Sequence, residues 1–462
     1  MALSVEITDW INHQRISKLQ ITVVCLCAMC ALFEGLDAQN IGFVAPAIIR
    51  EWGLPPHSFT PAFMSGLFGL LIGCLFIAPF ADKVGRKTIL LGSVASFALF
   101  SIFSAGARSL EALSILRFLT GLGIGGGMAN AIALTSEYFP ERRRAGMTVI
   151  MFLGFSFGAS LGGLLSAYLI PHFGWRSVFI VGGALPLLVA ILLAFALPES
   201  IRHLVAHNFP PSRINAILRR INPDVTFAQD TNFTIAEERK SGLTVAHLFR
   251  EGRALGTLLI WTVFFMSLLD IYLLASWLPV VLHDAGLTVS MSAVVTAMLH
   301  LGGVVVCAML VPILDHRGCL VIMLPAYLLA AFGIAALGSV GTSVILLMVT
   351  ATAAGIGIVC GQNTANAFAA AFYPTYIRAT GVGWALGIGR IGAIIGPGIG
   401  GIMLALDWTR QTILLVSAIP ELIAVAAILV LMRQGRVKAE LHSVAGSGLT
   451  PLQNSPPRSS AA

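Results

Sequence analysis

Two carboxylates, Glu34 and Asp37, stand inside a mostly apolar stretch that runs from Leu19 to Ile49. They are three residues apart, so on a helix they share one face. A charge at the depth of membrane hydrocarbon costs about 3 kcal/mol or more, so such residues normally face a polar cavity and have a function. Burial favours the neutral acid and a nearby arginine favours the carboxylate, which lets a carboxyl group gain and release a proton. We therefore predict that Asp37, sharing the proton with Glu34, carries protons across a membrane.

Two arginines, Arg117 and Arg390, also lie within apolar segments. Arginine is always charged and grips a carboxylate with a two-pronged fork of N–H groups. We predict that Arg390 clamps the carboxylate of a substrate, with an internal ion pair to Glu34 or Asp37 as the alternative. Arg117 lies nearer the start of its segment, and there a substrate contact and a structural ion pair are both open.

Further polar side chains interrupt the later apolar segments. Asp270 either lines the transport pathway or caps an unwound turn. His300 is a possible second proton site, although a lone histidine on an apolar helix is more often a packing residue. Three amides share one segment, and they could bind a ring hydroxyl of the substrate or join neighbouring helices; they are Gln362, Asn363 and Asn366.

Other candidates receive weaker roles. Trp277 could stack on an aromatic substrate, or it could simply pack against other helices. Glu421 follows a proline in the last apolar segment, and the sequence assigns it no role. Cys25, Cys27 and Cys30 have a spacing that resembles metal ligands, but no histidine or acidic residue is adjacent, so we expect buried thiols, no metal and no cofactor.

The composition places the chain in a membrane. Hydrophobic residues make up 57% of the 462 residues and charged residues only 11%, whereas soluble domains carry about 25% charged residues. The chain also contains repeated apolar runs of about 18 or more residues, which are typical of membrane-spanning helices. We predict an all-α membrane protein with twelve transmembrane helices, at about 19–49, 59–81, 88–107, 111–137, 146–170, 175–197, 254–282, 289–314, 319–338, 342–371, 379–405 and 410–432.

The basic residues are distributed unevenly between the two sides of the membrane. Only four of the 28 lysines and arginines lie in loops on the side opposite the termini, namely Arg50, Arg108, Arg176 and Arg410. This asymmetry predicts a cytoplasmic-membrane protein, inner membrane in a two-membrane cell, with both termini in the cytoplasm. It also accounts for the net charge of +7 without a nucleic-acid partner. The first apolar run is too long for a signal peptide, so we expect it to remain as the first helix.

The chain repeats itself with an offset of 233 to 234 residues. Asp82 recurs as Asp315, and Pro140 recurs as Pro374. Such a duplication predicts two pseudo-symmetric six-helix bundles with the substrate site between them at the membrane midplane. A short amphipathic helix is expected near 212–221. We expect four regions, a first bundle at 1–197, a cytoplasmic linker at 198–253, a second bundle at 254–432 and a disordered cytoplasmic tail at 433–462.

The loop after the second apolar segment carries a recognisable motif. Its sequence from Ala78 to Lys87 resembles the signature of the major facilitator superfamily, Gly-x-x-x-Asp-Arg-x-Gly-Arg-Lys, with alanine in place of the first glycine and Lys83 in place of the first arginine. The resemblance implies the major facilitator fold and assigns Asp82 and Arg86, with Asp315 and Arg378 in the second half, to conformational gating.

The chain is also similar to one branch of that superfamily, the aromatic acid:proton symporters, and in particular to carriers of hydroxyphenylpropionate and hydroxybenzoate type. The segments that carry this resemblance are Glu34-Gly35-Leu36-Asp37, Arg117-Phe118-Leu119-Thr120-Gly121, Trp277-Leu278-Pro279 and Gly389-Arg390-Ile391-Gly392. The resemblance implies a transporter, not an enzyme, that imports a small aromatic carboxylate with protons by alternating access, as a monomer surrounded by lipid. A carrier of the same superfamily for an aliphatic acid, a sugar or a drug is the alternative.

Overall fold

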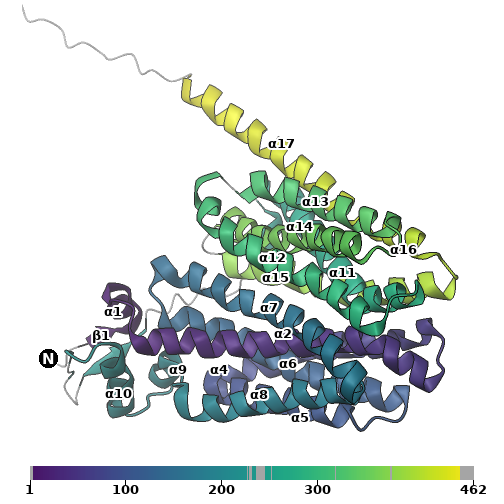
Figure 1. Ribbon diagram of the computed structural model, residues 1–462. Helices are drawn as coiled ribbons and strands as arrows, with labels where there is room; N and C mark the ends of the chain where they lie inside the picture. The colour runs from purple at the N-terminus through teal and green to yellow at the C-terminus, as the bar shows by residue number, and fades with distance from the viewer. Residues whose placement is uncertain are drawn as a thin grey trace, which may run out of the picture.

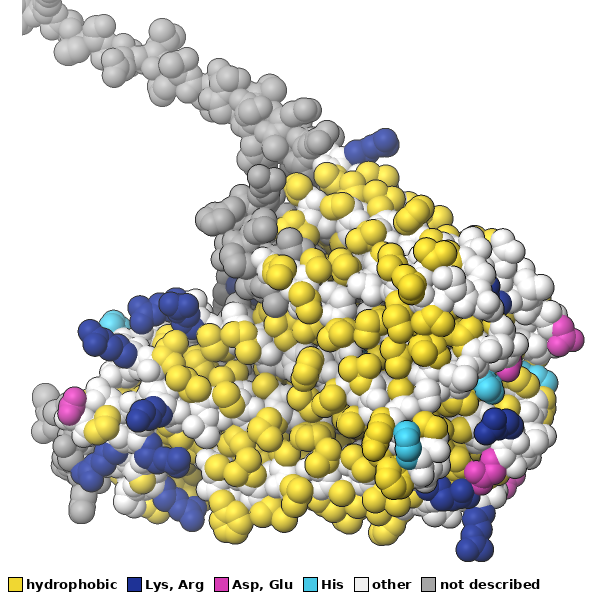
Figure 2. Space-filling view, in the orientation of Figure 1, with side chains coloured by type: hydrophobic (Ala, Val, Ile, Leu, Met, Phe, Trp, Pro, Cys, Tyr) yellow, Lys and Arg dark blue, Asp and Glu magenta, His cyan; other side chains and the backbone are white. Residues whose placement is uncertain are grey.

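The computed structural model describes residues 4–225, 227, 231–235, 245–250, 252–317, 319–374 and 377–447, apart from the side chains of 145, 308, 310–317, 379 and 435–447. Twelve helices of the described chain are long and apolar enough to cross a membrane, which confirms the predicted number of spans. Their long axes run roughly side by side, and hydrophobic side chains cover the band between the two ends of the molecule (Figures 1 and 2).

The N-terminal half contains six of these spans. They are α2 (Lys18–Trp52), α3 (Thr60–Ile72) with its continuation to α4 (Ala81–Val84), α5 (Arg86–Ser104), α6 (Leu110–Tyr138), α7 (Glu141–Phe173) and α8 (Arg176–Ala196). Local sequence sets the ends of α2. Ser17 and Gln20 form a capping box at its start, and Gly53 adopts a φ of 63° at its end, where a residue without a Cβ costs least.

The C-terminal half repeats the pattern. It is formed by α11 (Ala254–Asp284), α12 (Val289–Arg317), α13 (Cys319–Ser339), α14 (Val344–Phe372), α15 (Arg378–Ala405), α16 (Arg410–Ser417) and α17 (Ile419–Ser447). The span expected as one helix at 410–432 is interrupted between α16 and α17, next to Pro420, because proline has no N–H for the helix ladder. Helix α17 also continues beyond residue 432, into the segment expected as a disordered tail.

Short elements gather at one end of the N-terminal half (Figure 1). Strand β1 (Ser4–Glu6) pairs in parallel with β2 (Asn232–Thr234), so the start of the chain is tied to the linker. The amphipathic helix expected near 212–221 is present as α10 (Pro211–Ile221), which buries Ile214, Leu218 and Ile221. Helices α1 (Ile7–His13) and α9 (Ile201–Ala206) lie at the same end (Figure 1). The remaining short helices are η1 (Pro56–Phe59), which follows α2, η2 (Gly73–Ile77) and η3 (Ala78–Phe80) between α3 and α4, and η4 (Val245–Phe249).

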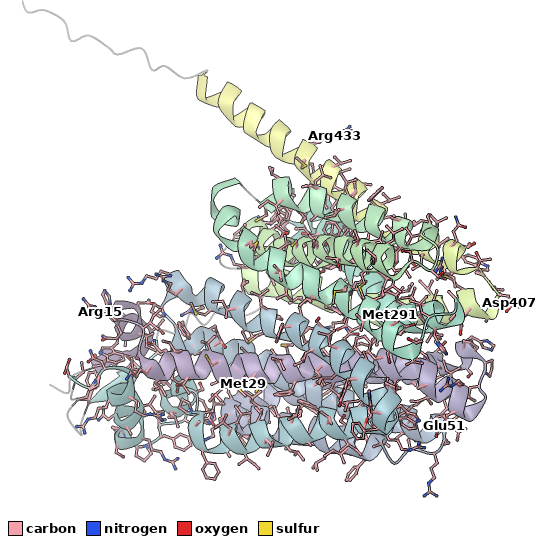
Figure 3. All side chains as sticks on the ribbon, viewed as in Figure 1. Arg15, Met29, Glu51, Met291, Asp407 and Arg433 are labelled. Atoms are coloured by element: carbon pink, nitrogen blue, oxygen red, sulfur yellow. The ribbon has the colours of Figure 1, made fainter. Side chains whose placement is uncertain are left out.

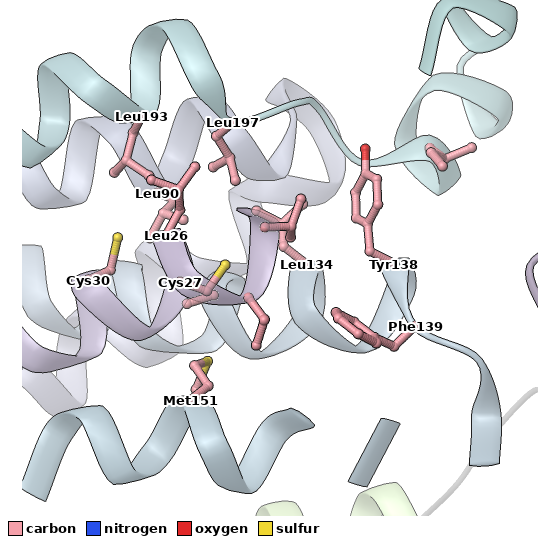
Figure 4. Close-up of a cluster of buried hydrophobic side chains, with 14 of the residues drawn as sticks. Leu26, Cys27, Cys30, Leu90, Leu134, Tyr138, Phe139, Met151, Leu193 and Leu197 are labelled. Atoms are coloured by element: carbon pink, nitrogen blue, oxygen red, sulfur yellow. The ribbon is translucent and has the colours of Figure 1, made fainter. Parts of the chain in front are cut away.

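The core of the N-terminal half lies between α2, α5, α6 and α8. Cys27 and Cys30 are completely buried there beside Leu90 and Met151 (Figure 4). They are free thiols, as the sequence predicted, whereas Cys25, which was also expected to be buried, is exposed. A thiol in such surroundings behaves as a small apolar group.

The two halves pack against each other through α7 with α12, α2 with α11 and α3 with α15. One apolar cluster spans the boundary and joins Ile48 of α2 and Phe63 of α3 to Trp277 of α11 and Met403 of α15. Ile49 and Trp52 pack against this cluster, so it lies next to Glu51, at the end of the molecule opposite Arg15 (Figure 3). The halves are therefore sealed together at the Glu51 end.

Glycines allow the helices of the C-terminal half to approach closely, and one such contact leads to a prediction about stability. A Cβ built at Gly355 of α14 would overlap the backbone carbonyl of Leu299 on α12, whereas one built at Gly387 of α15 would meet nothing within 4 Å. We expect Gly355→Ala to destabilise the protein by about 1–3 kcal/mol, the usual cost of overpacking, and to lower its melting temperature in detergent. Gly387→Ala is the matched control, and equal melting temperatures for the two variants would contradict the prediction.

Candidate transport site

Asp37 and Arg117 form a buried ion pair inside the N-terminal half. The Asp37 Oδ2 to Arg117 Nη1 distance is 3.1 Å, and the two side chains are 1% and 4% exposed. The Ser101 hydroxyl donates a hydrogen bond to the other carboxylate oxygen. The pair joins α2, α5 and α6, so a change in the charge of Asp37 acts on three helices at once.

Arg117 has several further partners in the same half. Its Nη2 donates to the hydroxyl oxygens of Ser104 at 2.8 Å and Thr120 at 3.1 Å, and its guanidinium lies 4.7 Å from the ring centre of Phe179. Arg117 thus forms an internal ion pair in this structure, and its contact with a substrate stays a prediction. A cavity of about 30 Å³ lies beside the pair between α2, α3 and α6, large enough for a water molecule.

Glu34 lies on the same helix as Asp37 but has different neighbours. It is completely buried, its carboxylate lies against Gly127 of α6, and neither of its oxygens accepts a hydrogen bond from the described residues. The charge that acts on it is that of Arg390 in the other half. Glu34 is therefore a buried carboxyl group whose electrostatic partner lies across the boundary between the halves.

Arg390 is partly buried on α15. Its side chain interacts with the hydroxyl of Tyr272 on α11, and its charge acts on Glu34 and Cys74 of the N-terminal half. Its interaction with Glu34 agrees with the alternative of an internal partner, and the clamp on a substrate carboxylate stays a prediction.

The amides of α14 are partly buried. Asn363 donates a hydrogen bond to the carbonyl of Val359 at 2.9 Å within its own helix. The side-chain oxygens of Gln362 and Asn366 accept no hydrogen bond from the described residues, and they could therefore accept one from a ligand. His300 on α12 is 2% exposed, and its Nε2 is likewise without a described partner.

Trp277 lies in the sealed boundary rather than beside Arg390. Its indole N–H donates to the carbonyl of Pro397 at 2.8 Å, its ring packs edge-on at 4.9 Å from Phe63, and it is 1% exposed. In this conformation the indole has no free face for a substrate. Its role here is packing, which was the alternative left open by the sequence.

Asp270 and Glu421 are paired, which sequence reasoning missed. Both are completely buried, and their carboxyl groups, on α11 and α17, are within hydrogen-bonding reach of each other. The repeat relates Asp270 to Asp37, since it lies 233 residues later, the offset that separates Asp82 and Asp315, but the sequence gives no sign of its pairing with Glu421.

The signature loop forms a network of charges at the end with α9 and α10. Arg86 binds Glu137 at 2.8 Å and lies 4.0 Å from Asp82, and the Ser200 hydroxyl donates to the other oxygen of Glu137. These contacts join the start of α5 and the end of α6 to the start of the linker. In the second copy, Arg378 reaches the carbonyl of Tyr373 at 3.5 Å, while the side chain of Asp315 lies outside the described residues.

A twelve-span bundle in two repeated halves, with buried charges near their boundary, defines a membrane transporter. The sequence pattern of the Major Facilitator Superfamily matches residues 27–397, and the chain belongs to that family. The fold is also that of the partially occluded inward-open xylose transporter XylE from E. coli, with a TM-score of 0.71 at 16% identity over 90% of this chain and 98% of that one. The protein is therefore a multi-pass membrane transporter and not an enzyme.

Two relatives match nearly the whole chain. It is 42% identical to the gallate transporter of Pseudomonas putida, over 92% of this chain and 94% of the relative. It is 38% identical to the 4-hydroxybenzoate transporter PcaK of the same organism, over 92% of this chain and 96% of the relative. These relatives confirm the predicted resemblance to aromatic acid carriers.

Proposed function

We propose that this protein imports a small aromatic carboxylate together with protons by alternating access. The observation that carries the proposal is the set of charged side chains within the helices, with Asp37 bound to Arg117 at 3.1 Å inside the N-terminal half and Glu34 related to Arg390 across the boundary. Similarity to a gallate carrier and a 4-hydroxybenzoate carrier over more than nine-tenths of the chain supports the substrate class.

In this proposal Asp37 is the proton carrier. A proton on Asp37 removes its charge and releases Arg117, which is otherwise held between α2, α5 and α6. Because a buried ion pair resists separation far more than a neutral hydrogen bond does, protonation lowers the cost of moving these helices relative to each other. Glu34 can gain or lose a proton together with Asp37, since it lies one turn earlier on α2.

The substrate carboxylate is assigned to Arg390. The guanidinium offers a fork of N–H donors, and Tyr272 orients it from α11. Gln362 and Asn366 have side-chain oxygens free to accept a hydrogen bond from a ring hydroxyl. We therefore assign the carboxylate of the substrate to Arg390 and a ring hydroxyl group to these amides.

We assign the end with α1, α9 and α10 to the cytoplasm of a bacterial inner membrane. Lysine and arginine side chains gather there (Figure 2), as expected for the inner side of a membrane. Because the halves are sealed at the opposite end by the cluster around Trp277, this conformation faces inward. The Arg86–Glu137 pair and Asp82 would then be gating contacts remade during each cycle.

The test is uptake by the purified protein in liposomes with an acidic exterior. We expect labelled 4-hydroxybenzoate or gallate to accumulate and a protonophore to abolish the accumulation. Unlabelled aromatic acids should compete, whereas aliphatic acids, sugars and cationic drugs should not. Accumulation that ignores the pH gradient would contradict symport, and equal competition by an aliphatic acid or a sugar would favour a carrier of the same family for another solute.

A further inference from the structure

The membrane-embedded part of the C-terminal half contains two acids that face each other. Asp270 lies near the middle of α11, and Glu421 lies at the break between α16 and α17. Both side chains are completely buried, while their neighbours Ile419 and Leu422 are exposed on the outer surface at 48% and 50%. The carboxyl groups therefore point into the half and not toward lipid.

The two carboxyl groups face each other without a donor. They are within hydrogen-bonding reach of each other, yet no N–H or O–H group of the described residues donates to any of their four oxygens. Two ionised carboxylates can only accept hydrogen bonds. Such a contact is stable only when a proton lies between the two groups.

The surroundings supply hydroxyl groups and no counterion. Tyr327 of α13 faces Glu421 and interacts with the hydroxyl of Ser267 on α11, and both hydroxyl groups are completely buried without another described partner. Arg390 on α15 acts on Tyr272, Glu34 and Cys74 instead. Among the described groups, no arginine, lysine or histidine, including His300 on α12, acts on either carboxyl.

The repeat of the chain relates this pair to the proton carrier assigned above. An offset of 233 residues brings Asp37 onto Asp270 and Glu34 onto Ser267. The N-terminal acid is balanced by a guanidinium at 3.1 Å, whereas the C-terminal acid faces a second carboxyl group. In the C-terminal half the charge of the acid is therefore balanced by a proton, as Arg117 balances it in the N-terminal half.

We propose that Asp270 and Glu421 form a second proton-binding site, in which one proton is shared between the two carboxyl groups. The site lies on α11, two residues before Tyr272, which contacts Arg390. Gain or loss of this proton is thereby linked to the helix that orients the substrate clamp. The exchange of this proton during transport rests on the proposed symport, but the existence of the site does not.

The first test detects the proton directly, without transport. Infrared difference spectra of the purified protein should contain protonated-carboxyl bands at neutral pH that shift in Asp270→Asn and in Glu421→Gln and are lost in the double variant Asp270→Asn/Glu421→Gln. In each single variant the remaining acid is buried without a counterion and keeps its proton, but its hydrogen-bond partner is now an amide. The matched control is Asp284→Asn, at the exposed end of the same helix. Bands that stay unchanged in the two single variants and in the double variant would overturn the proposal, whatever the protein transports.

The second test counts protons in liposomes. We expect each single variant to move about one proton fewer per substrate than the wild type and Asp284→Asn. The double variant Asp270→Asn/Glu421→Gln, in which two amides can bind each other, should show the same loss. An unchanged proton stoichiometry and an unchanged pH profile would show that the pair only joins the two helices and does not exchange its proton during transport. Uptake that depends on sodium and loses this dependence in Glu421→Gln would make it a cation site instead.

Discussion

Asparagine in place of Asp37 should remove the share of substrate accumulation that the Asp37 proton drives, while leaving exchange of substrate across the membrane. One pH unit supplies about 1.4 kcal/mol per proton, so each coupled proton can raise the accumulation about tenfold. In the Asp37→Asn variant the accumulation ratio should fall about tenfold below that of the wild type, because the amide cannot carry a proton. Uptake driven by a pH gradient measures the accumulation, and counterflow of labelled substrate without a gradient measures the exchange.

The local structure makes this variant informative. The oxygen of asparagine can accept from Arg117, and its NH2 group can donate to the hydroxyl oxygen of Ser101, so the contacts at Asp37 are largely kept. The matched control is Asp37→Glu, which retains an acid at the same place and should keep proton-driven accumulation, at a reduced rate. Full accumulation by Asp37→Asn would show that another group carries the proton, and loss of counterflow as well would show that Asp37 serves the fold or the substrate instead.

Most of the fold was accessible from the sequence because membrane spans have a strong signal. Long apolar runs give the helices, and two motifs with nearly equal offsets give the repeated halves. The break between α16 and α17 was missed even though Pro420 was visible, because proline is tolerated within many transmembrane helices. The pairing of β1 with β2 involves three residues on each strand, too few to leave a pattern.

The site was predicted in its residue types but not in its pairings. Sequence reasoning singled out Asp37, Arg117, Glu34 and Arg390 because charges are costly in lipid, and all four lie in buried or partly buried positions. It could not decide that Arg117 binds Asp37, since that depends on how α2, α5 and α6 rotate as they pack. Likewise nothing in the chain order brings Glu421 to Asp270. Helix packing, and not spacing in the sequence, selects the partners.

Glutamine in place of Arg390 should weaken substrate binding by roughly thirtyfold to several thousandfold. Truncating one partner of a desolvated charge pair costs about 2–5 kcal/mol, and every 1.4 kcal/mol is a factor of ten. Arg390→Lys should recover only part of the affinity, because lysine keeps the charge and loses the planar fork. The matched control is Arg410→Gln, whose guanidinium binds the carbonyls of Val340 and Gly341 in a loop. Equilibrium binding of labelled 4-hydroxybenzoate to purified protein measures the effect.

A ligand lacking the carboxylate separates the clamp from an internal role of Arg390. 4-Hydroxybenzamide keeps the ring and the hydroxyl group but not the charge, so the wild type should bind it weakly and Arg390→Gln should bind it no worse. Such non-additivity is the sign of direct contact between the two groups that were changed. If Arg390 only balances Glu34, the variant should lose affinity for both ligands equally. Glu34→Gln/Arg390→Gln should then restore binding, because it removes the unbalanced charge that the single variant leaves buried.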